Sequence, residues 1–265
     1  MSIPLLFARR KFSPLRLFSA GEQGVWYDPS DLSTLFKLST DTEANVAVGD
    51  PVGKILDKSG RGNHATQTTL TARPILRQDA FGRYYLEFDG VDDCLFTGNI
   101  NFTATDKMTV WAGVRKLSDA AQGLLIELSA SFSTNPGSFS IQAPGSPASQ
   151  YYIGSQNALY TNRYAPVTYA APITNIITAI YDLAGSTLET IVTPRINGEV
   201  ARNGGAGSGA GAINFGNYPM YIGRRGNVTG PFNGRIYSLI VLGAQSTATQ
   251  ISNMETWVNR KTGAY

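Results

Sequence analysis

The clearest periodic pattern in this chain lies between residues 84 and 93. Apolar and polar positions alternate there, so that Leu86 and Phe88 fall on one face of an extended strand and Glu87 falls on the other. Gly90 then ends the strand, because glycine accepts the positive φ that a tight turn requires. The pattern predicts a β-strand with one buried and one solvated face, followed by an acidic turn.

Further segments along the chain also have the composition of strands. They are residues 108–114, 176–182, 194–199, 220–224 and 232–239. Near the C-terminus the pattern changes, because Ile251, Met254 and Val258 recur at helical spacing after a capping box at residues 247–250. Gly263 is placed to end that helix. The sequence predicts an all-β chain that ends in one short helix.

A second glycine-rich polar turn occupies residues 56–65, upstream of the acidic turn. The two turns, with the strand segments that follow them in order, resemble the laminin-G-like branch of the concanavalin A-like lectin/glucanase superfamily over residues 50–262. The resemblance implies a jelly-roll β-sandwich of two antiparallel sheets with a short C-terminal helix. Lectin-like binding and, in some members, glycan hydrolysis are the activities that it implies.

Composition narrows this picture in two ways. Hydrophobic residues make up 42% of the chain and charged residues 15%, which is typical of a globular protein with an ample core. Cys94 is the only cysteine, so no intrachain disulfide can form, and we expect it to be buried.

The apolar run at residues 3–8 is too short to span a membrane, and the positive charges follow this run instead of preceding it. We therefore expect no signal peptide and synthesis in the cytoplasm.

The positive charge is concentrated at the N-terminus. Residues 1–21 contain four basic residues and no acidic one, so their net charge is +4. The whole chain has a net charge of +3, and the rest of the chain therefore carries −1. A body without basic excess argues against nucleic acid as a partner. The arm mixes these charges with apolar side chains, which favours docking on another protein. The predicted docking residues are Arg9, Arg10, Lys11, Phe12 and Arg16. A solvated tail is the alternative.

The segment at residues 21–36, together with this arm, resembles the opening of virion-associated proteins of tailed phages and prophages. We therefore divide the chain into an anchoring arm (1–21), an aromatic connector on the sandwich edge (22–49) and the jelly-roll domain (50–265). The resemblance implies a location in the virion and other virion proteins as partners. It also implies a homo-oligomer, for which we expect a trimer.

Two sets of residues are candidates for binding. Asp57, Asn63, Asp92 and Asp93 offer oxygen ligands in adjacent turns and are the candidate calcium site, with turn stabilisation by hydrogen bonds as the alternative. A segment rich in tyrosine and amides is the candidate glycan platform, because aromatic faces and amides bind sugars. Its residues are Tyr151, Tyr152, Asn157, Tyr160, Arg163 and Tyr164. Core or subunit contact is an equally weighted interpretation of these tyrosines.

Catalysis is not supported by these residues. Glu87, Asp89 and Asp92 approach the carboxylate pattern of related glucanases, but Asp92 lies beyond the turn and an Asp stands where that family has a Glu. His64 is the only histidine, and a polar surface role is expected for it. We predict a non-enzymatic virion protein, a tail or baseplate appendage that contacts host surface glycan. A capsid decoration or purely structural protein is the first alternative, and a glycan hydrolase is the second.

Overall fold

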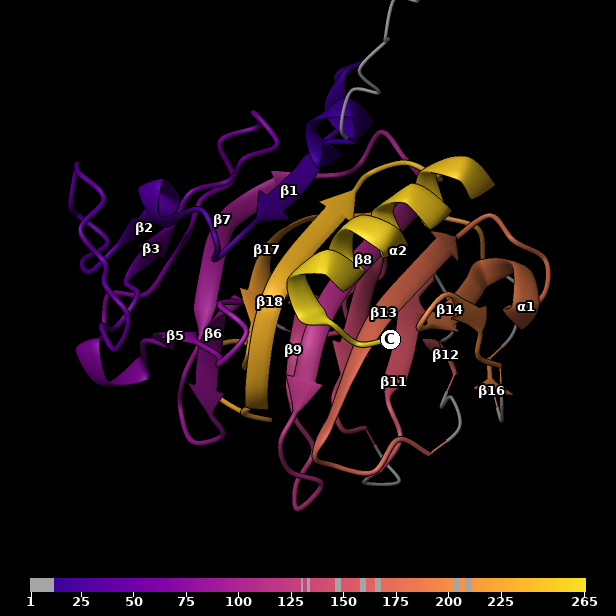
Figure 1. Cartoon of the computed structure of the whole chain (residues 1–265). Helices are drawn as coiled ribbons and strands as arrows, with labels where there is room; N and C mark the ends of the chain where they lie inside the picture. Colours follow the sequence, from indigo (N-terminus) through magenta and orange to yellow (C-terminus); the bar gives the residue numbers. More distant parts are fainter. Residues whose placement is uncertain are drawn as a thin grey trace, which may run out of the picture.

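The computed structural model of the chain is a sandwich of two antiparallel β-sheets (Figure 1). The structure describes residues 12–129, 131–132, 134–145, 149–157, 161–164 (backbone only), 168–202, 205–207 and 211–265. Two sheets and a long C-terminal helix confirm the predicted all-β fold class.

The first sheet, sheet A, contains eight strands within the described residues. Their order is β15-β14-β13-β8-β18-β6-β5, and β1 also pairs with β18. Their bounds are Gly24–Tyr27 (β1), Ile75–Gln78 (β5), Tyr84–Asp89 (β6), Lys107–Lys116 (β8), Ile173–Asp182 (β13), Val192–Ile196 (β14), Glu199–Val200 (β15) and Asn233–Leu242 (β18).

The second sheet, sheet B, contains ten strands in the described part of the chain. Their order is β16-β12-β11-β10-β9-β17-β7-β4-β3-β2. Their bounds are Leu35–Phe36 (β2), Lys54–Ile55 (β3), Ala65–Thr66 (β4), Leu95–Asn101 (β7), Leu124–Leu128 (β9), Ser138–Gln142 (β10), Tyr152–Gln156 (β11), Thr161–Tyr164 (β12), Gly205–Ala206 (β16) and Asn217–Ile222 (β17).

Helices are few and lie outside the two sheets. The α-helices are α1 (Leu188–Ile191) and α2 (Ala248–Thr262), and the 3₁₀ turns are η1 (Pro14–Phe18), η2 (Leu32–Thr34) and η3 (Leu70–Ala72). Helix α2 crosses the outer face of sheet A over β18, β8 and β13 (Figure 1). None of the described helices has both the length and the apolar character needed to cross a membrane.

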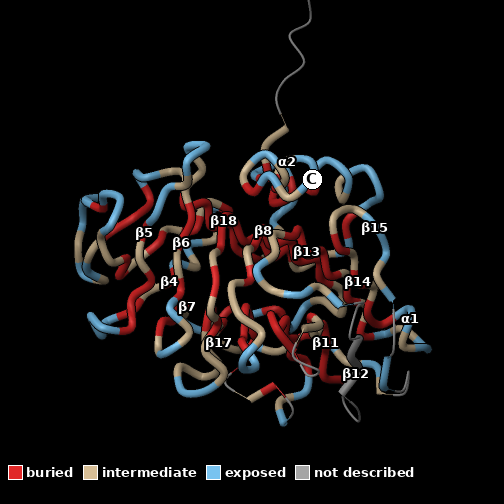
Figure 2. Tube along the Cα trace, turned by 60° about the horizontal axis from the view of Figure 1, so that its bottom comes forward, coloured by how far each residue is buried: buried red, intermediate tan, exposed pale blue. Residues whose placement is uncertain are grey.

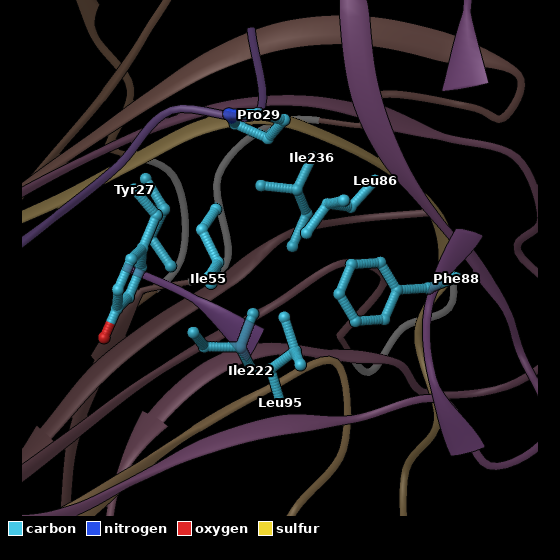
Figure 3. Close-up of a pocket in the computed structure, with 9 residues that line it drawn as sticks. Tyr27, Pro29, Ile55, Leu86, Phe88, Leu95, Ile222 and Ile236 are labelled. Carbon is cyan, nitrogen blue, oxygen red and sulfur yellow. The ribbon is translucent and has the colours of Figure 1, made fainter. Parts of the chain in front are cut away.

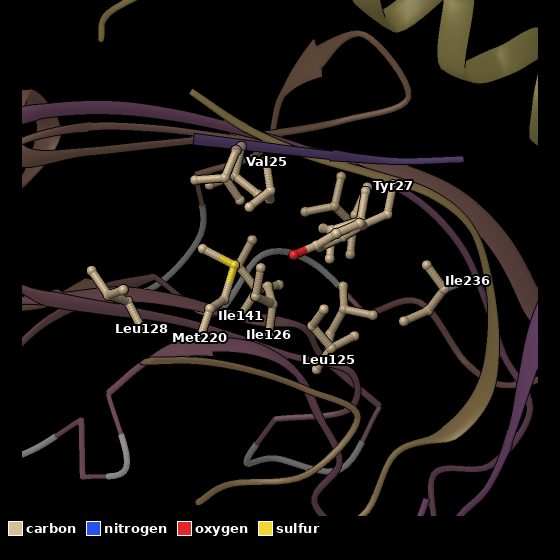
Figure 4. Packing of buried hydrophobic residues seen from close by; sticks show 14 of the residues in the cluster. Val25, Tyr27, Leu125, Ile126, Leu128, Ile141, Met220 and Ile236 are labelled. Carbon is tan, nitrogen blue, oxygen red and sulfur yellow. The ribbon is translucent and has the colours of Figure 1, made fainter. Parts of the chain in front are cut away.

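The alternation predicted for residues 84–89 is observed in β6. Leu86 and Phe88 are buried between the sheets, whereas Glu87 lies on the outer face of sheet A, half-buried. Tyr85, on the face that was expected to be solvated, is buried against Tyr237. The main core fills the space between the sheets, where the tube of Figure 2 is red. Figure 4 shows Val25 and Tyr27 of sheet A facing Ile126, Ile141 and Met220 of sheet B. Both sheets therefore bury one face against the other.

A second apolar cluster lies between sheet A and helix α2. Its buried residues are Leu17, Phe18, Trp26, Trp111, Ile176, Ile240, Leu242, Met254 and Val258. Gly113 on β8 lets the helix approach, since a Cβ there would lie 2.4 Å from Cγ2 of Thr262. The predicted capping box of α2 is observed: the Thr247 hydroxyl accepts from Gln250 N, and the Gln250 side chain accepts from Thr247 N. Gly263 ends the helix in the left-handed conformation.

The described part of the N-terminal arm is packed on the body of the protein. Leu17 and Phe18 of η1 are almost fully buried in the cluster beneath α2. The Arg61 guanidinium donates hydrogen bonds to the carbonyl oxygens of Phe18 (2.6 Å) and Glu22 (2.8 Å), which ties this turn to the 56–65 loop. From Pro14 onward the arm is thus part of the folded unit, and the solvated-tail alternative does not hold for η1.

Cys94 is fully buried, as predicted from the sequence. Burial raises the pKa of its thiol to about 12, because the thiolate would lose hydration there. The thiol is therefore an apolar filler and not a reactive group.

Candidate functional site

A polar recess opens where the loop between β17 and β18 meets the adjoining ends of β9 and β10. It has a volume of about 60 Å³ and is lined by Gln122, Leu124, Gln142, Arg225, Thr229 and Gly230. Backbone hydrogen bonds join its walls: Leu124 N donates to Gly230 O (2.8 Å), and Ala143 N donates to Gly123 O (2.7 Å). Three segments distant in the sequence are thereby held together around one opening.

Two glutamine side chains form one wall of the recess. The Gln122 amide nitrogen donates to the amide oxygen of Gln142 at 2.5 Å. Gln142 is buried at the end of β10, whereas Gln122 is exposed in the loop between β8 and β9. Because one amide orients the other, their remaining polar atoms have fixed directions.

Arg225 contributes a guanidinium group that is anchored from behind. Its Nε donates to Oε2 of Glu127 at 2.8 Å, and Glu127 is fully buried on β9. Burial raises the pKa of Glu127, whereas the charge and the hydrogen bond of Arg225 lower it. Arg225 itself is one-third exposed. The tight turn of residues 225–229 fixes its backbone, because Arg225 N donates to Thr229 O (2.7 Å).

Tyr152 connects the predicted glycan platform with this recess. It is the antiparallel partner of Gln142 across β10 and β11, so both side chains lie on the same face of sheet B. Its side chain is half-buried and lies against Gly145, where a Cβ would come within 2.5 Å of the tyrosine Cβ. Tyr152 is therefore an aromatic neighbour of the two amides.

The other predicted glycan residues are placed differently. Tyr151 is fully buried; its hydroxyl accepts from Asn175 Nδ2 at 2.8 Å, and its ring lies 5.2 Å from the Lys116 ammonium. Tyr151 therefore lies in the core, as the alternative interpretation expected: it directly precedes β11, and its hydroxyl contacts Asn175 of β13 in sheet A. Asn157 is also buried. Tyr160 and the side chains of Arg163 and Tyr164 lie outside the described residues.

Asp57 and Asn63 of the candidate calcium site are engaged in hydrogen bonds within their own turn. The Asp57 carboxylate accepts from Trp26 N (2.9 Å) and from Ser59 N (2.8 Å), and Asn63 N donates to it at 3.1 Å. The Asn63 amide nitrogen donates in turn to Gly24 O at 2.8 Å. These contacts are those of the turn-stabilisation alternative.

Asp92 and Asp93 lie in the acidic turn after β6, together with Asp89. Ligand atoms of the three carboxylates lie within 4.8 Å of one another. Asp89 accepts from Val91 N (2.7 Å), and Asp93 accepts from Asp89 N (2.9 Å). Burial raises the pKa of Asp93 to about 7, and the neighbouring carboxylates act in the same direction. Asp89 thus joins Asp92 and Asp93 as a candidate metal ligand. Among the described residues, no contact connects these three carboxylates with Asp57 or Asn63.

The remaining candidate residues have structural partners. Glu87 forms ion pairs with Arg77 and with Arg235, each at 3.2 Å. His64 is exposed, and its Nδ1 accepts from Asp57 N at 3.0 Å. Of the predicted docking residues, Phe12 packs at the edge of the cluster beneath α2. Arg16 is exposed, and Arg9, Arg10 and Lys11 lie outside the described residues.

An apolar cavity between the sheets is too small for a ligand. It has a volume of about 10 Å³ and is lined by Tyr27, Pro29, Ile55, Leu86, Phe88, Leu95, Ile222, Ile236 and Leu239, most of which are labelled in Figure 3. A space of this size holds about one water molecule at most. The cavity is a packing defect of the core, and the polar recess remains the candidate site.

The recess residues were not identified from the sequence. Gln122, Gln142 and Arg225 are far apart in the chain, and none belongs to a recognisable motif. The only local signal was the alternation of Ser138, Ser140 and Gln142 with apolar residues in β10, which marks a polar outer face.

No known protein-family model and no curated protein matches this sequence. Solved structures with a similar fold include a botulinum neurotoxin type C chain, with a TM-score of 0.53 and 12% identity over 77% of this chain and 48% of that one. The botulinum neurotoxin serotype G binding domain has a TM-score of 0.54 and 11% identity, with the same coverage. Trypanosoma rangeli sialidase has a TM-score of 0.54 and 12% identity over 91% of this chain and 33% of that one.

These likenesses concern the fold. At 11–12% identity the chain shares the β-sandwich of these proteins and spans about half the length of the neurotoxin chains. The architecture is thus one found in binding domains and in a sialidase, and the residues of the site must supply the argument for function.

Proposed function

We propose that this protein is a non-enzymatic, lectin-like component of a tailed-phage virion, a tail or baseplate appendage that contacts a glycan of the host surface. The observation that supports this most directly is the polar recess. It combines two amides, a guanidinium group and a hydroxyl beside the half-buried ring of Tyr152.

These groups match what a sugar offers. Amide and guanidinium groups donate to and accept from ring hydroxyls, and an aromatic face packs on the C–H surface of a pyranose. Arg225 is held by Glu127, and Gln142 is held by Gln122, so little side-chain entropy remains to be lost when a ligand binds. The recess has a volume of about 60 Å³, so in the proposed complex it contacts part of one sugar residue and does not enclose it.

The similar folds are consistent with this proposal. The botulinum neurotoxin type C chain interacts with two ganglioside molecules, which carry sugars, and another similar structure is a sialidase. A hydrolase would require a pair of carboxylates across the bound sugar. The carboxylate next to the recess is Glu127, which is buried behind Arg225. The geometry therefore favours binding over hydrolysis.

The virion context rests on the resemblance of the N-terminal arm and the 21–36 segment to virion-associated proteins. In the proposed arrangement the arm attaches the protein to the particle, and the sandwich projects its recess toward the host. A capsid decoration or assembly protein would use the same arm but would bind no sugar.

The glycan proposal is tested by the change in melting temperature with a broad set of bacterial surface glycans. A ligand that binds only the folded state raises Tm, by an amount that grows with its concentration over Kd. We expect at least one glycan to raise Tm of the full chain and to have no effect on the Gln142→Ala variant. The control is Asn253→Ala, which removes an exposed amide from helix α2 and should respond as the parent does.

Three results would count against this proposal. No shift across the whole set would favour the decoration or assembly alternative. A shift that Gln142→Ala retains in full would place the sugar elsewhere. Release of free sugar during the incubation would support the hydrolase.

A further inference from the structure

Two arginines stand directly opposite each other on the outer face of sheet A. Arg235 on β18 is the antiparallel partner of Arg115 on β8. Neighbouring strands lie about 4.8 Å apart, and like charges directly opposite each other destabilise a sheet. The sheet thus holds two positive charges side by side in a position that costs stability.

The pair belongs to a row that runs across four adjacent strands. Glu87 on β6 is the partner of Arg235, and Thr174 on β13 is the partner of Arg115. The alternation of β8 puts Arg115 on the same face as Trp111, which packs beneath α2. All four side chains of the row are half-buried, so they remain accessible from solvent.

The two arginines are held in place but unequally neutralised. Arg235 forms an ion pair with Glu87 at 3.2 Å and lies 4.6 Å from the centre of the Tyr85 ring. Glu87 is shared, since its other oxygen accepts from Arg77 at 3.2 Å. Arg115 donates to the Thr174 hydroxyl at 3.0 Å, and no carboxylate of the described residues lies within ion-pairing distance of it. Two arginines therefore share one glutamate, and Arg115 has no acidic partner among the described residues.

We propose that Arg115 and Arg235 form a binding site for one anionic group of a surface polysaccharide. A guanidinium group has five N–H donors in a planar fork that matches a carboxylate or a phosphate. The contacts described use only part of this capacity. An anionic group that reaches both guanidinium groups accepts hydrogen bonds from both and offsets the repulsion between their charges.

The surroundings favour an acidic sugar over a nucleic acid. A nucleic acid needs a broad basic surface, whereas the chain beyond residue 21 carries a net charge of −1. A compact site with one aromatic neighbour and one hydroxyl suits a single charged sugar residue. The charge comes from the carboxylate of a uronic acid or from a phosphodiester between sugars.

The test is the binding of the full chain to three polymers at low and moderate salt: polygalacturonate, poly(glycerol phosphate) and neutral dextran. We expect one or both anionic polymers to bind, and dextran not to. Arg115→Gln should weaken that binding by about tenfold or more, since charge-assisted hydrogen bonds are lost. Binding of only one anionic polymer identifies the source of the charge.

Arg260→Gln is the matched control, because it removes the same charge from an exposed position on α2. Equal weakening by the two variants, or no binding of either anionic polymer, would overturn the proposal. Folding of Arg115→Gln is verified by its Tm, which should not fall because a repulsion has been removed.

This site is independent of the recess, and the variants separate the two. Gln142→Ala should leave the binding of the anionic polymer unchanged. Arg115→Gln should leave the Tm shift produced by a neutral glycan unchanged.

Discussion

The surroundings of the Asp93 carboxylate disfavour its charge. It is almost fully buried at the end of the acidic turn, with Asp89 and Asp92 beside it. Its pKa of about 7 in the folded protein lies above the value of about 3.9 in an unfolded chain. The folded state therefore binds a proton more tightly than the unfolded state, and it loses this advantage as the pH rises.

Replacing Asp93 with Asn should remove a pH dependence of stability. In the parent protein this residue should lower the free energy of unfolding by on the order of 2–4 kcal/mol between about pH 4 and pH 7, with no further loss above that. Asn keeps an oxygen that can accept from Asp89 N, so the variant should be more stable than the parent at pH 8 and similar to it at pH 4. Urea unfolding at several pH values measures this. Glu43→Gln, at an exposed position, should keep the parental slope, and an unchanged slope in Asp93→Asn would contradict the argument.

Helix α2 is attached to sheet A by buried apolar side chains and by an ion pair. Met254 and Val258 are fully buried against the sheet, and Glu255 forms an ion pair with Arg195 of β14 at 2.8 Å. The hydrogen bond and charge of Glu255 raise the pKa of Arg195 further. The helix thus covers a face of the sheet that would otherwise be exposed and apolar.

Met254→Ala should lower the free energy of unfolding by about 2–5 kcal/mol, because it leaves a cavity in the cluster beneath α2. Chemical denaturation followed by tryptophan fluorescence measures the loss, since Trp111 and Trp257 lie at that cluster. The neighbouring Asn253→Ala should change stability by less than about 0.5 kcal/mol. Equal effects of the two substitutions would show that the helix is not packed as described.

Elements with strong local patterns could be predicted from the sequence, whereas contacts between distant segments could not. The alternation around Leu86 predicted one strand, and the capping box at Thr247 predicted one helix. Both patterns involve residues that are close together in the sequence. Tyr151 was ambiguous because a strand in a sandwich offers tyrosine both a core face and a surface. Gln142 and Arg225 line the same recess only because of the strand order of sheet B, which no local sequence pattern specifies.

At the scale of the whole molecule, the arm combines a packed turn with the basic stretch before it. Leu17 and Phe18 belong to the core beneath α2. Arg9, Arg10 and Lys11 precede the described residues and carry the proposed attachment to the virion.

Two truncations should therefore behave differently. Removing residues 1–11 should leave Tm of the protein nearly unchanged but abolish its incorporation into particles. Removing residues 1–20 should also lower Tm, because the three buried side chains of η1 (Pro14, Leu17 and Phe18) are lost. Thermal unfolding and immunoblots of purified particles measure the two effects. Normal incorporation of the shorter truncation would refute anchoring by the basic residues.

The order of strands in sheet A has a consequence for synthesis of the chain. Strand β18 lies at the centre of the sheet, between β8 and β6, yet it is the last strand of that sheet to leave the ribosome. Until it emerges, β6 and β8 both present unpaired backbone edges, which favour association between nascent chains. Slow translation upstream of residue 233 would lengthen the time during which these two edges remain unpaired.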